Sequence, residues 1–171
     1  ITNVNEAPNA LAAIGTNLIT NGSFESGPSQ GAPTGWTFSG PGGIELSKPS
    51  KATDGTQYLA LNGWSNTSGA ILSQNITTVA GTTYTILFPG TVPQVLNIQA
   101  LNGATAILDQ TITDPTPAGD YNVASMQRYI FTFTATGTTT TIRFADQSAT
   151  STGNDLDLDN VRVFANANPV V

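Results

Sequence analysis

The chain has 171 residues and a formal net charge of −6, from eleven acidic residues against five Lys and Arg, and it contains no His and no Cys. This length suits one domain with short flanking pieces. The acidity excludes a basic patch that could displace counterions from nucleic acid, and it disfavours membrane surfaces for the same reason. The lack of Cys excludes disulfides and Cys-ligated zinc, and no apolar run reaches the roughly 20 residues that span a bilayer.

The two ends of the chain have the composition of linkers. Residues 1–16 contain a short β-like run, then Pro8, then small residues, and residues 165–171 have a similar character. We therefore place one domain at 17–164 and expect interdomain linkers at 1–16 and 165–171. Because the first residues lack the basic and apolar pattern of a signal peptide, we expect the chain to belong to a longer polypeptide.

Between the linkers, short alternations of apolar and polar residues recur at the 8–12 residue spacing of sandwiches and barrels, and no window has a helical period. The composition, rich in Thr, Gly, Asn and Ser, agrees with an all-β fold. The predicted strands lie near 18–20, 36–39, 43–47, 57–61, 69–77, 82–89, 94–101, 105–112, 128–134, 139–146 and 157–164. The residues expected to face the core are Tyr84, Ile86, Phe88, Leu96, Ile98, Ala100, Tyr129, Phe131, Phe133, Ile142, Phe144, Val161 and Val163.

Acidic residues inside these apolar patterns point to a metal. The period of two in the last strand puts Asp159 on the inward side with Val161 and Val163. A buried carboxylate costs several kcal/mol unless it is paired, and calcium takes carboxylate and carbonyl oxygens. We therefore predict calcium ligation by Asp159, by Glu25 if the terminal segments lie side by side, and by Asp54. Asp54 has an equal alternative role in building a turn.

Asp155 and Asp157 also lie in the last acidic segment, four and two positions before Asp159, respectively. We expect these two carboxylates at a solvated edge rather than as metal ligands.

An ordered set of motifs carries a family resemblance. These are NLITNGSFE (17–25), GW (35–36), DGTQYLALNG (54–63), ILSQ (71–74), VAGTTY (79–84) and LDNV (158–161). Together they resemble the galactose-binding-domain-like jelly roll, an antiparallel β-sandwich found in carbohydrate-binding modules of families four, nine and twenty-two and in bacterial choice-of-anchor surface domains. The resemblance implies that Glu25 and Asp159 lie at a structural calcium site. Residues 4–8, VNEAP, resemble the seam between bacterial cadherin-like repeats.

Several side chains are candidates for binding a sugar. Trp36 stands in the family's Gly-Trp position within an apolar strand, so we expect it in the core. Trp64 lies in a polar loop, where its ring could stack on a sugar face or fold back over the sandwich edge. The polar side chains expected on outward strand faces are Asn97, Gln99, Arg128 and Arg143. Taken singly, each of these four is better explained as an ordinary polar surface residue.

Catalysis has little support in the sequence. The lack of His and Cys excludes Ser-His-Asp and Cys-His arrangements, and no pair of carboxylates has a glycosidase-like motif. We expect a non-catalytic, calcium-stabilised carbohydrate-binding module of a larger bacterial adhesin or surface enzyme, outside the cell. Its expected partners are a glycan and neighbouring extracellular repeat domains. The alternative is a spacer or peptide-contacting domain of an adhesin with no sugar ligand.

Overall fold

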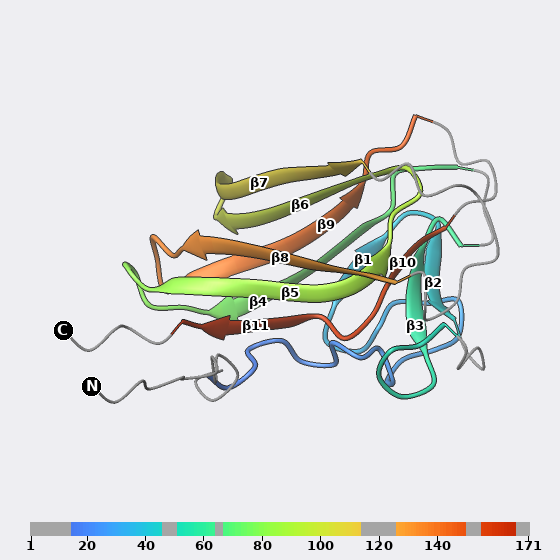
Figure 1. Ribbon diagram of the computed structural model, residues 1–171, viewed down its shortest axis with the longest axis horizontal. Coiled ribbons are helices and arrows are strands. Elements are labelled where there is room, and N and C mark those ends of the chain that lie inside the picture. The colour runs from blue at the N-terminus through green and yellow to red at the C-terminus, as the bar shows by residue number, and fades with distance from the viewer. Residues whose placement is uncertain (1–14, 46–50, 64–66, 114–125, 150–154, 167–171) are drawn as a thin grey trace, which may run out of the picture.

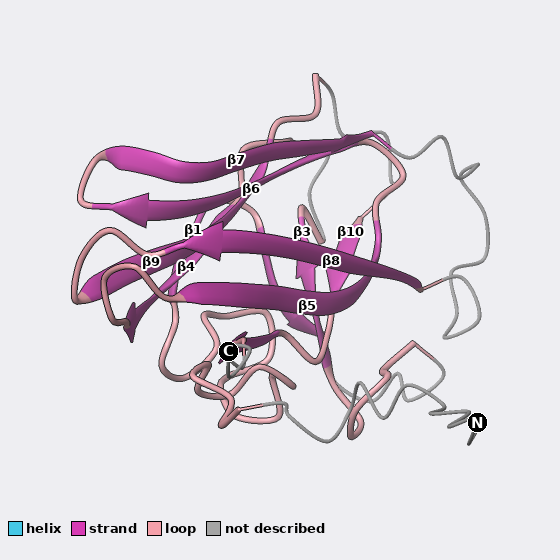
Figure 2. Ribbon diagram, turned by 60° about the vertical axis from the view of Figure 1, so that its left-hand side comes forward, coloured by secondary structure: helices cyan, strands magenta, loops and turns pink. Residues whose placement is uncertain are grey.

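The computed structural model describes residues 15–45, 51–63, 67–113, 126–149 and 155–166. Every regular element in these residues is a strand (Figure 2). The strands are β1 (Thr37–Ser39), β2 (Gly42–Glu45), β3 (Tyr58–Leu61), β4 (Ile71–Thr77), β5 (Thr83–Thr91), β6 (Val95–Asn102), β7 (Thr105–Thr113), β8 (Gln127–Thr134), β9 (Thr139–Asp146), β10 (Leu156–Leu158) and β11 (Arg162–Ala165).

Two antiparallel sheets form the domain (Figure 1). One has the strand order β1-β4-β9-β6-β7, and the other has the order β11-β5-β10-β3-β2, with β8 added beside β5. Strand β5 organises the second sheet, because β8 pairs along one of its edges while β11 and β10 share the other edge in succession. The all-β sandwich expected from the alternation is therefore confirmed.

The core lies between the two sheets and contains the side chains that the alternation selected. Tyr84, Ile86 and Phe88 of β5 are buried against Ile142 and Phe144 of β9. The rings of Phe88 and Phe144 meet edge to face with centroids 5.2 Å apart, which joins the two sheets. On strand β8, which pairs only with β5, Tyr129 and Phe131 are partly buried, whereas Phe133 is buried.

The structure differs from the predicted strands at two places. The last predicted strand is interrupted between β10 and β11, where Asn160 has a φ of 45°. Residues 18–20 form no regular strand, although this segment lies along β11 (Figure 1). There the Leu18 N–H donates to the Val163 carbonyl at 2.8 Å, and the Val161 N–H donates to the Gly22 carbonyl at 2.9 Å. The two ends of the domain therefore meet, as the sequence predicted.

Most of the predicted linkers, together with the cadherin-like seam, lies outside the described residues, so the domain boundaries stay predictions. In the described part of the chain, no helix is long and apolar enough to cross a membrane.

Candidate functional site

Two carboxylates from opposite ends of the domain hold one loop, residues 53–57. Asp159, which is fully buried, accepts at Oδ2 from the Thr53 N–H at 2.5 Å, the Thr53 hydroxyl at 2.7 Å and the Asp54 N–H at 2.9 Å. Glu25 accepts at Oε1 from the Thr56 N–H at 2.7 Å and the Gln57 N–H at 2.6 Å. We call Glu25, Asp159 and residues 53–57 the carboxylate loop site.

The local backbone explains how the two acids reach this loop. Gly55 has a φ of 80°, and a Cβ there would lie 2.5 Å from the Glu25 Cδ, so the close approach requires glycine. Phe24, directly before Glu25, has a φ of 57°, and Asn160, directly after Asp159, has a φ of 45°. Left-handed backbone is unfavourable for an aromatic residue, and the full burial of the Phe24 ring holds it in place. The fold thus turns both acids toward one loop.

The electrostatics of Asp159 are those of a desolvated acid. Burial raises the pKa of its carboxyl above the ordinary value of 3.8, and hydrogen bonds from Thr53, Asp54 and Asn160 oppose this increase. No Lys or Arg among the described residues forms an ion pair with Asp159. The acid is therefore stabilised by N–H and O–H donors in place of a cationic side chain.

The fit of a cation to the carboxylate loop site is partial. Two carboxylates on one loop supply the hard oxygen donors that calcium prefers, and one buried acid lacks a counter-charge. However, Asp159 already accepts four hydrogen bonds, three at Oδ2 and one at Oδ1 from the Asn160 N–H at 2.7 Å. Only Oδ1 therefore keeps a lone pair for a further partner. The described residues contain no group of three or more His, Cys, Asp or Glu placed to hold a metal.

The third predicted ligand, Asp54, is exposed and contributes its backbone N–H to Asp159 rather than its carboxylate. Both its role as a ligand and its alternative role in building a turn stay predictions.

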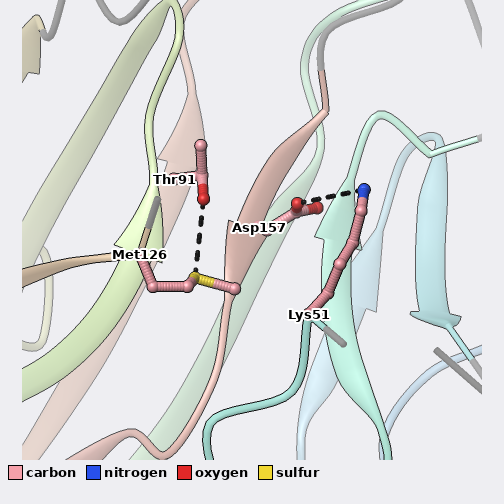
Figure 3. A network of polar contacts seen from close by, with 4 residues as sticks. All are labelled: Lys51, Thr91, Met126 and Asp157. Atoms are coloured by element: carbon pink, nitrogen blue, oxygen red, sulfur yellow. Dashed lines mark hydrogen bonds and ion pairs between the residues drawn. The ribbon is translucent and has the colours of Figure 1, made fainter. Parts of the chain in front are cut away.

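The position of Asp157 corrects the sequence interpretation, which placed it at a solvated edge. Asp157 is fully buried on β10, which pairs with β3 on one side and β5 on the other. Its carboxylate points to the Lys51 ammonium, 3.7 Å away (Figure 3), while the Thr91 hydroxyl contacts the Met126 sulfur at 3.5 Å nearby. The expectation was wrong because alternation alone does not show that a strand is central in its sheet.

A second cluster lies on the outer face of the five-stranded sheet and brings together three of the four predicted strand-face residues. The Arg143 guanidinium donates to the Gln99 Oε1 at 2.8 Å. Asp109 accepts from the Asn97 amide at 2.7 Å and from the Gln99 amide at 3.1 Å. The pKa of Asp109 is lowered, first by the hydrogen bond from Asn97 and then by that from Gln99, with a smaller contribution from the Arg143 charge.

The strand register extends this cluster into a line across the whole sheet. Thr37 of β1 pairs with Ser73 of β4, Ser73 with Arg143 of β9, Arg143 with Gln99 of β6, and Gln99 with Asp109 of β7. Because neighbouring strands are about 4.8 Å apart, the five positions span about 19 Å. We call this set, Thr37, Ser73, Arg143, Gln99 and Asp109, the polar row.

The other predicted sugar contacts lie elsewhere. Arg128 is on β8 of the six-stranded sheet, where it lines a pocket with Arg162. Trp64 lies outside the described residues, so its stacking role stays a prediction. Trp36 is in the core, as expected, with its ring centroid 6.4 Å from that of Phe144 and its indole N–H bonded to the Asn21 carbonyl.

Sequence reasoning assigned no binding role to two residues that the structure brings to these sites: Asp109, which was set aside as a surface residue, and Arg162. Asp109 stood out by no motif, and only its register partner Gln99 shows its place in the polar row. Arg162 lies between Val161 and Val163, so the alternation that buries those two valines was a signal that Arg162 faces outward.

Comparison with known proteins gives the fold. No protein-family model matches the chain, and no curated protein sequence matches it significantly. Among solved structures, the Stig cyclase Fisc from Fischerella sp. TAU, in complex with an indole compound, is similar with a TM-score of 0.67 and 18% identity, covering 91% of this chain and 100% of that one.

Two sugar-binding domains are also similar. The module TmCBM61 in complex with β-1,4-galactotriose has a TM-score of 0.60 and 15% identity, over 88% of this chain and 99% of that one. A CBM4 module has a TM-score of 0.52 and 20% identity, over 86% and 99%. The chain thus has the β-sandwich jelly-roll fold of carbohydrate-binding modules, and the predicted fold class is confirmed.

The cyclase similarity corrects one expectation. The sequence led us to expect a domain that is not an enzyme, and that expectation is wrong because the cyclases from Fischerella have the same fold. The absence of His and Cys, and of a glycosidase-like carboxylate motif, therefore did not suffice to exclude catalysis.

Proposed function

We propose that this domain binds carbohydrate and that the polar row is its glycan-binding surface. The observation that carries the proposal is the unbroken line of hydroxyl, guanidinium, amide and carboxylate groups across five strands. Sugar hydroxyls both donate and accept hydrogen bonds, so they need such alternating partners. The fold shared with TmCBM61 and CBM4 supports this reading.

The geometry favours a chain of sugars over a single ring. The row is about 19 Å long at a strand spacing of about 4.8 Å, and its members come from a rigid sheet rather than from a loop. Gln99 and Arg143 are half-buried, so their side chains are already oriented before a ligand arrives. Preorganised donors lower the entropy cost of binding. Trp64 remains the proposed stacking platform.

The test is a glycan array with the wild-type domain, followed by calorimetry on any sugar that binds. Arg143→Ala should weaken binding about tenfold or more, because a hydrogen bond from a charged group contributes about 1.5–3 kcal/mol. Gln99→Ala should weaken binding about two- to tenfold, because a neutral hydrogen bond contributes about 0.5–1.5 kcal/mol. Thr132→Ala, an exposed change on β8 of the other sheet, is the matched control and should bind as the wild type does.

Two results would contradict the proposal. One is a folded wild-type domain that binds no glycan on the array, which would favour the spacer alternative. The other is a bound glycan whose affinity is unchanged in both row variants.

We also propose that calcium binds at the carboxylate loop site, held by Glu25 and Asp159, with Asp54 as a further ligand. The buried acid without a cationic partner supports this, and the ion would supply the missing positive charge. A ligand bound only by the folded state stabilises it by about 2.7 kcal/mol at 100 times its Kd. Calcium should therefore raise the melting temperature of the wild type and chelator should lower it, whereas Glu25→Gln should respond less. Identical melts in calcium and chelator would remove the proposal.

We also propose that the domain lies outside the cell, which the similarity in fold to carbohydrate-binding modules supports, and that it adjoins further repeat domains, which the cadherin-like seam at residues 4–8 suggests.

A further inference from the structure

A pocket of about 270 Å³ opens on the outer face of the six-stranded sheet, on the opposite side of the sandwich from the polar row. Its lining residues are Thr53, Leu87, Pro89, Arg128, Asn160 and Arg162. Ligand pockets generally have volumes of about 300–1,000 Å³, so this one suits a ligand of about one sugar ring.

The topology of β5 explains why two arginines meet there. Leu87 and Pro89 alternate with the core residues Ile86 and Phe88, so they face outward and form an apolar floor. Arg128 of β8 is the register partner of Pro89 on one edge of β5. On the other edge, Arg162 of β11 is the partner of Leu87. The two guanidinium-bearing strands thus flank the floor from both sides.

Among the described residues, neither arginine has an anionic partner, although acidic residues outnumber basic ones by eleven to five in the chain. Neither guanidinium makes a hydrogen bond or ion pair with any described residue, and the Arg162 Nε is buried without a partner. By contrast, Arg143 on the other sheet is bonded to Gln99. A buried N–H donor without a partner costs about 1–3 kcal/mol. A ligand that accepted a hydrogen bond from the Arg162 Nε would therefore remove this cost.

Two acidic residues close to the pocket in sequence and topology, Asp157 and Asp159, do not pair with the two arginines. Asp157 on β10 faces Lys51 at 3.7 Å. Asp159, just before the pocket residue Asn160, is fully buried and has its oxygens bonded to Thr53, Asp54 and Asn160. These two described carboxylates therefore do not pair with Arg128 or Arg162, whose donors remain open to a ligand.

We propose that this pocket binds the anionic group of an acidic sugar, with Arg128 and Arg162 holding the oxyanion over Leu87 and Pro89. The planar fork of Arg matches the paired oxygens of a carboxylate, and it also matches a sulfate ester. The apolar floor can cover the C–H face of the ring that carries the charge. This inference rests on the proposed function and gives it a second, charge-selective subsite.

The experiment is a titration of the ¹⁵N-labelled domain, followed by NMR at about 0.15 M salt, with sodium glucuronate, galactose 6-sulfate, glucuronate methyl ester and glucose as four separate probes. We expect glucuronate to shift the Arg128 and Arg162 side-chain signals and the ester and glucose to leave them unchanged. Saturable shifts with galactose 6-sulfate alone would assign the site to sulfated sugars, and shifts with both anions would assign it to either group.

Variants separate the pocket from general electrostatics. Arg128→Gln and Arg162→Gln should each weaken glucuronate binding about tenfold, the effect of losing a charged hydrogen bond. Thr132→Glu lowers the net charge by the same amount on the same strand and face, but about 13 Å from Arg128, beyond the Debye length of about 8 Å at this salt. It should bind normally. If Arg162→Gln does not fold, Arg128→Gln alone decides.

The outcomes also distinguish this inference from the proposed function. Loss of neutral-glycan binding in Arg143→Ala, with no saturable anion effect at Arg128 or Arg162, would overturn the pocket and leave the polar row standing. Glucuronate binding that is reduced equally by Thr132→Glu and Arg128→Gln would also overturn the pocket. Anion binding at the pocket without any effect of the row variants would support the pocket and refute the polar row.

Discussion

Asp159→Ala gives the sharpest test of how the carboxylate loop site stabilises the domain. The substitution removes the acceptor of four hydrogen bonds, two from Thr53, one from Asp54 and one from Asn160. At about 1.5 kcal/mol for each bond to a charged group, the gross loss is about 6 kcal/mol. About half of this returns, because a buried charge is removed and the exposed Asp54 N–H can bond to water.

We therefore expect Asp159→Ala to lower the free energy of unfolding by about 3 kcal/mol. For a domain of this size, about 2–4 °C is lost per kcal/mol, so the melting temperature should fall by about 6–12 °C. The measurement is thermal and urea unfolding in buffer with chelator, so that no bound cation contributes. Asp54→Ala is the control from the same loop, and its exposed side chain should change stability by less than about 0.5 kcal/mol. Equal melting temperatures for Asp159→Ala and Asp54→Ala would refute the reasoning.

The other predictions concern pH, the meeting of the chain ends and the polar row. Burial raises the pKa of Asp159 above 3.8, so this carboxyl binds a proton more tightly in the folded state than in the unfolded state. Without cations, the free energy of unfolding of the wild type relative to Asp159→Asn should therefore fall as pH rises through the folded-state pKa. A relative free energy of unfolding that rises with pH would contradict this. Gly22→Ala would place a Cβ 2.0 Å from the Val161 carbonyl oxygen and should cost about 1–3 kcal/mol in urea unfolding; an unaltered midpoint would show that the two ends are not in contact. Asn97→Ala removes the hydrogen bond that contributes most to lowering the Asp109 pKa, so NMR titration should find this pKa closer to its ordinary value, and no change would show that the cluster does not form in solution.

Much of the fold could be predicted because local pattern and tertiary packing agree. Period-two alternation placed the strands from β1 to β9 to within about two residues of their observed ends, and it selected the core side chains of β5, β6 and β9. The split between β10 and β11 could not be predicted in this way, because it depends on a left-handed Asn160 that lets Asp159 reach Thr53. Alternation describes one strand at a time and carries no information about such a turn.

The candidate sites depended more on tertiary structure. The sequence alone indicated that Glu25 and Asp159 belong to one site, since each is an acid within an apolar segment, and it singled out Asn97, Gln99 and Arg143. It could not place Asp109 beside Gln99, bury Asp157 at the centre of a sheet, or bring Arg128 and Arg162 to opposite edges of β5. Composition and alternation determine which apolar side chains leave water, because the burial of an apolar side chain depends mainly on its own polarity. Which polar side chains then meet depends on strand order and register, and these are decided by contacts between residues far apart in the chain.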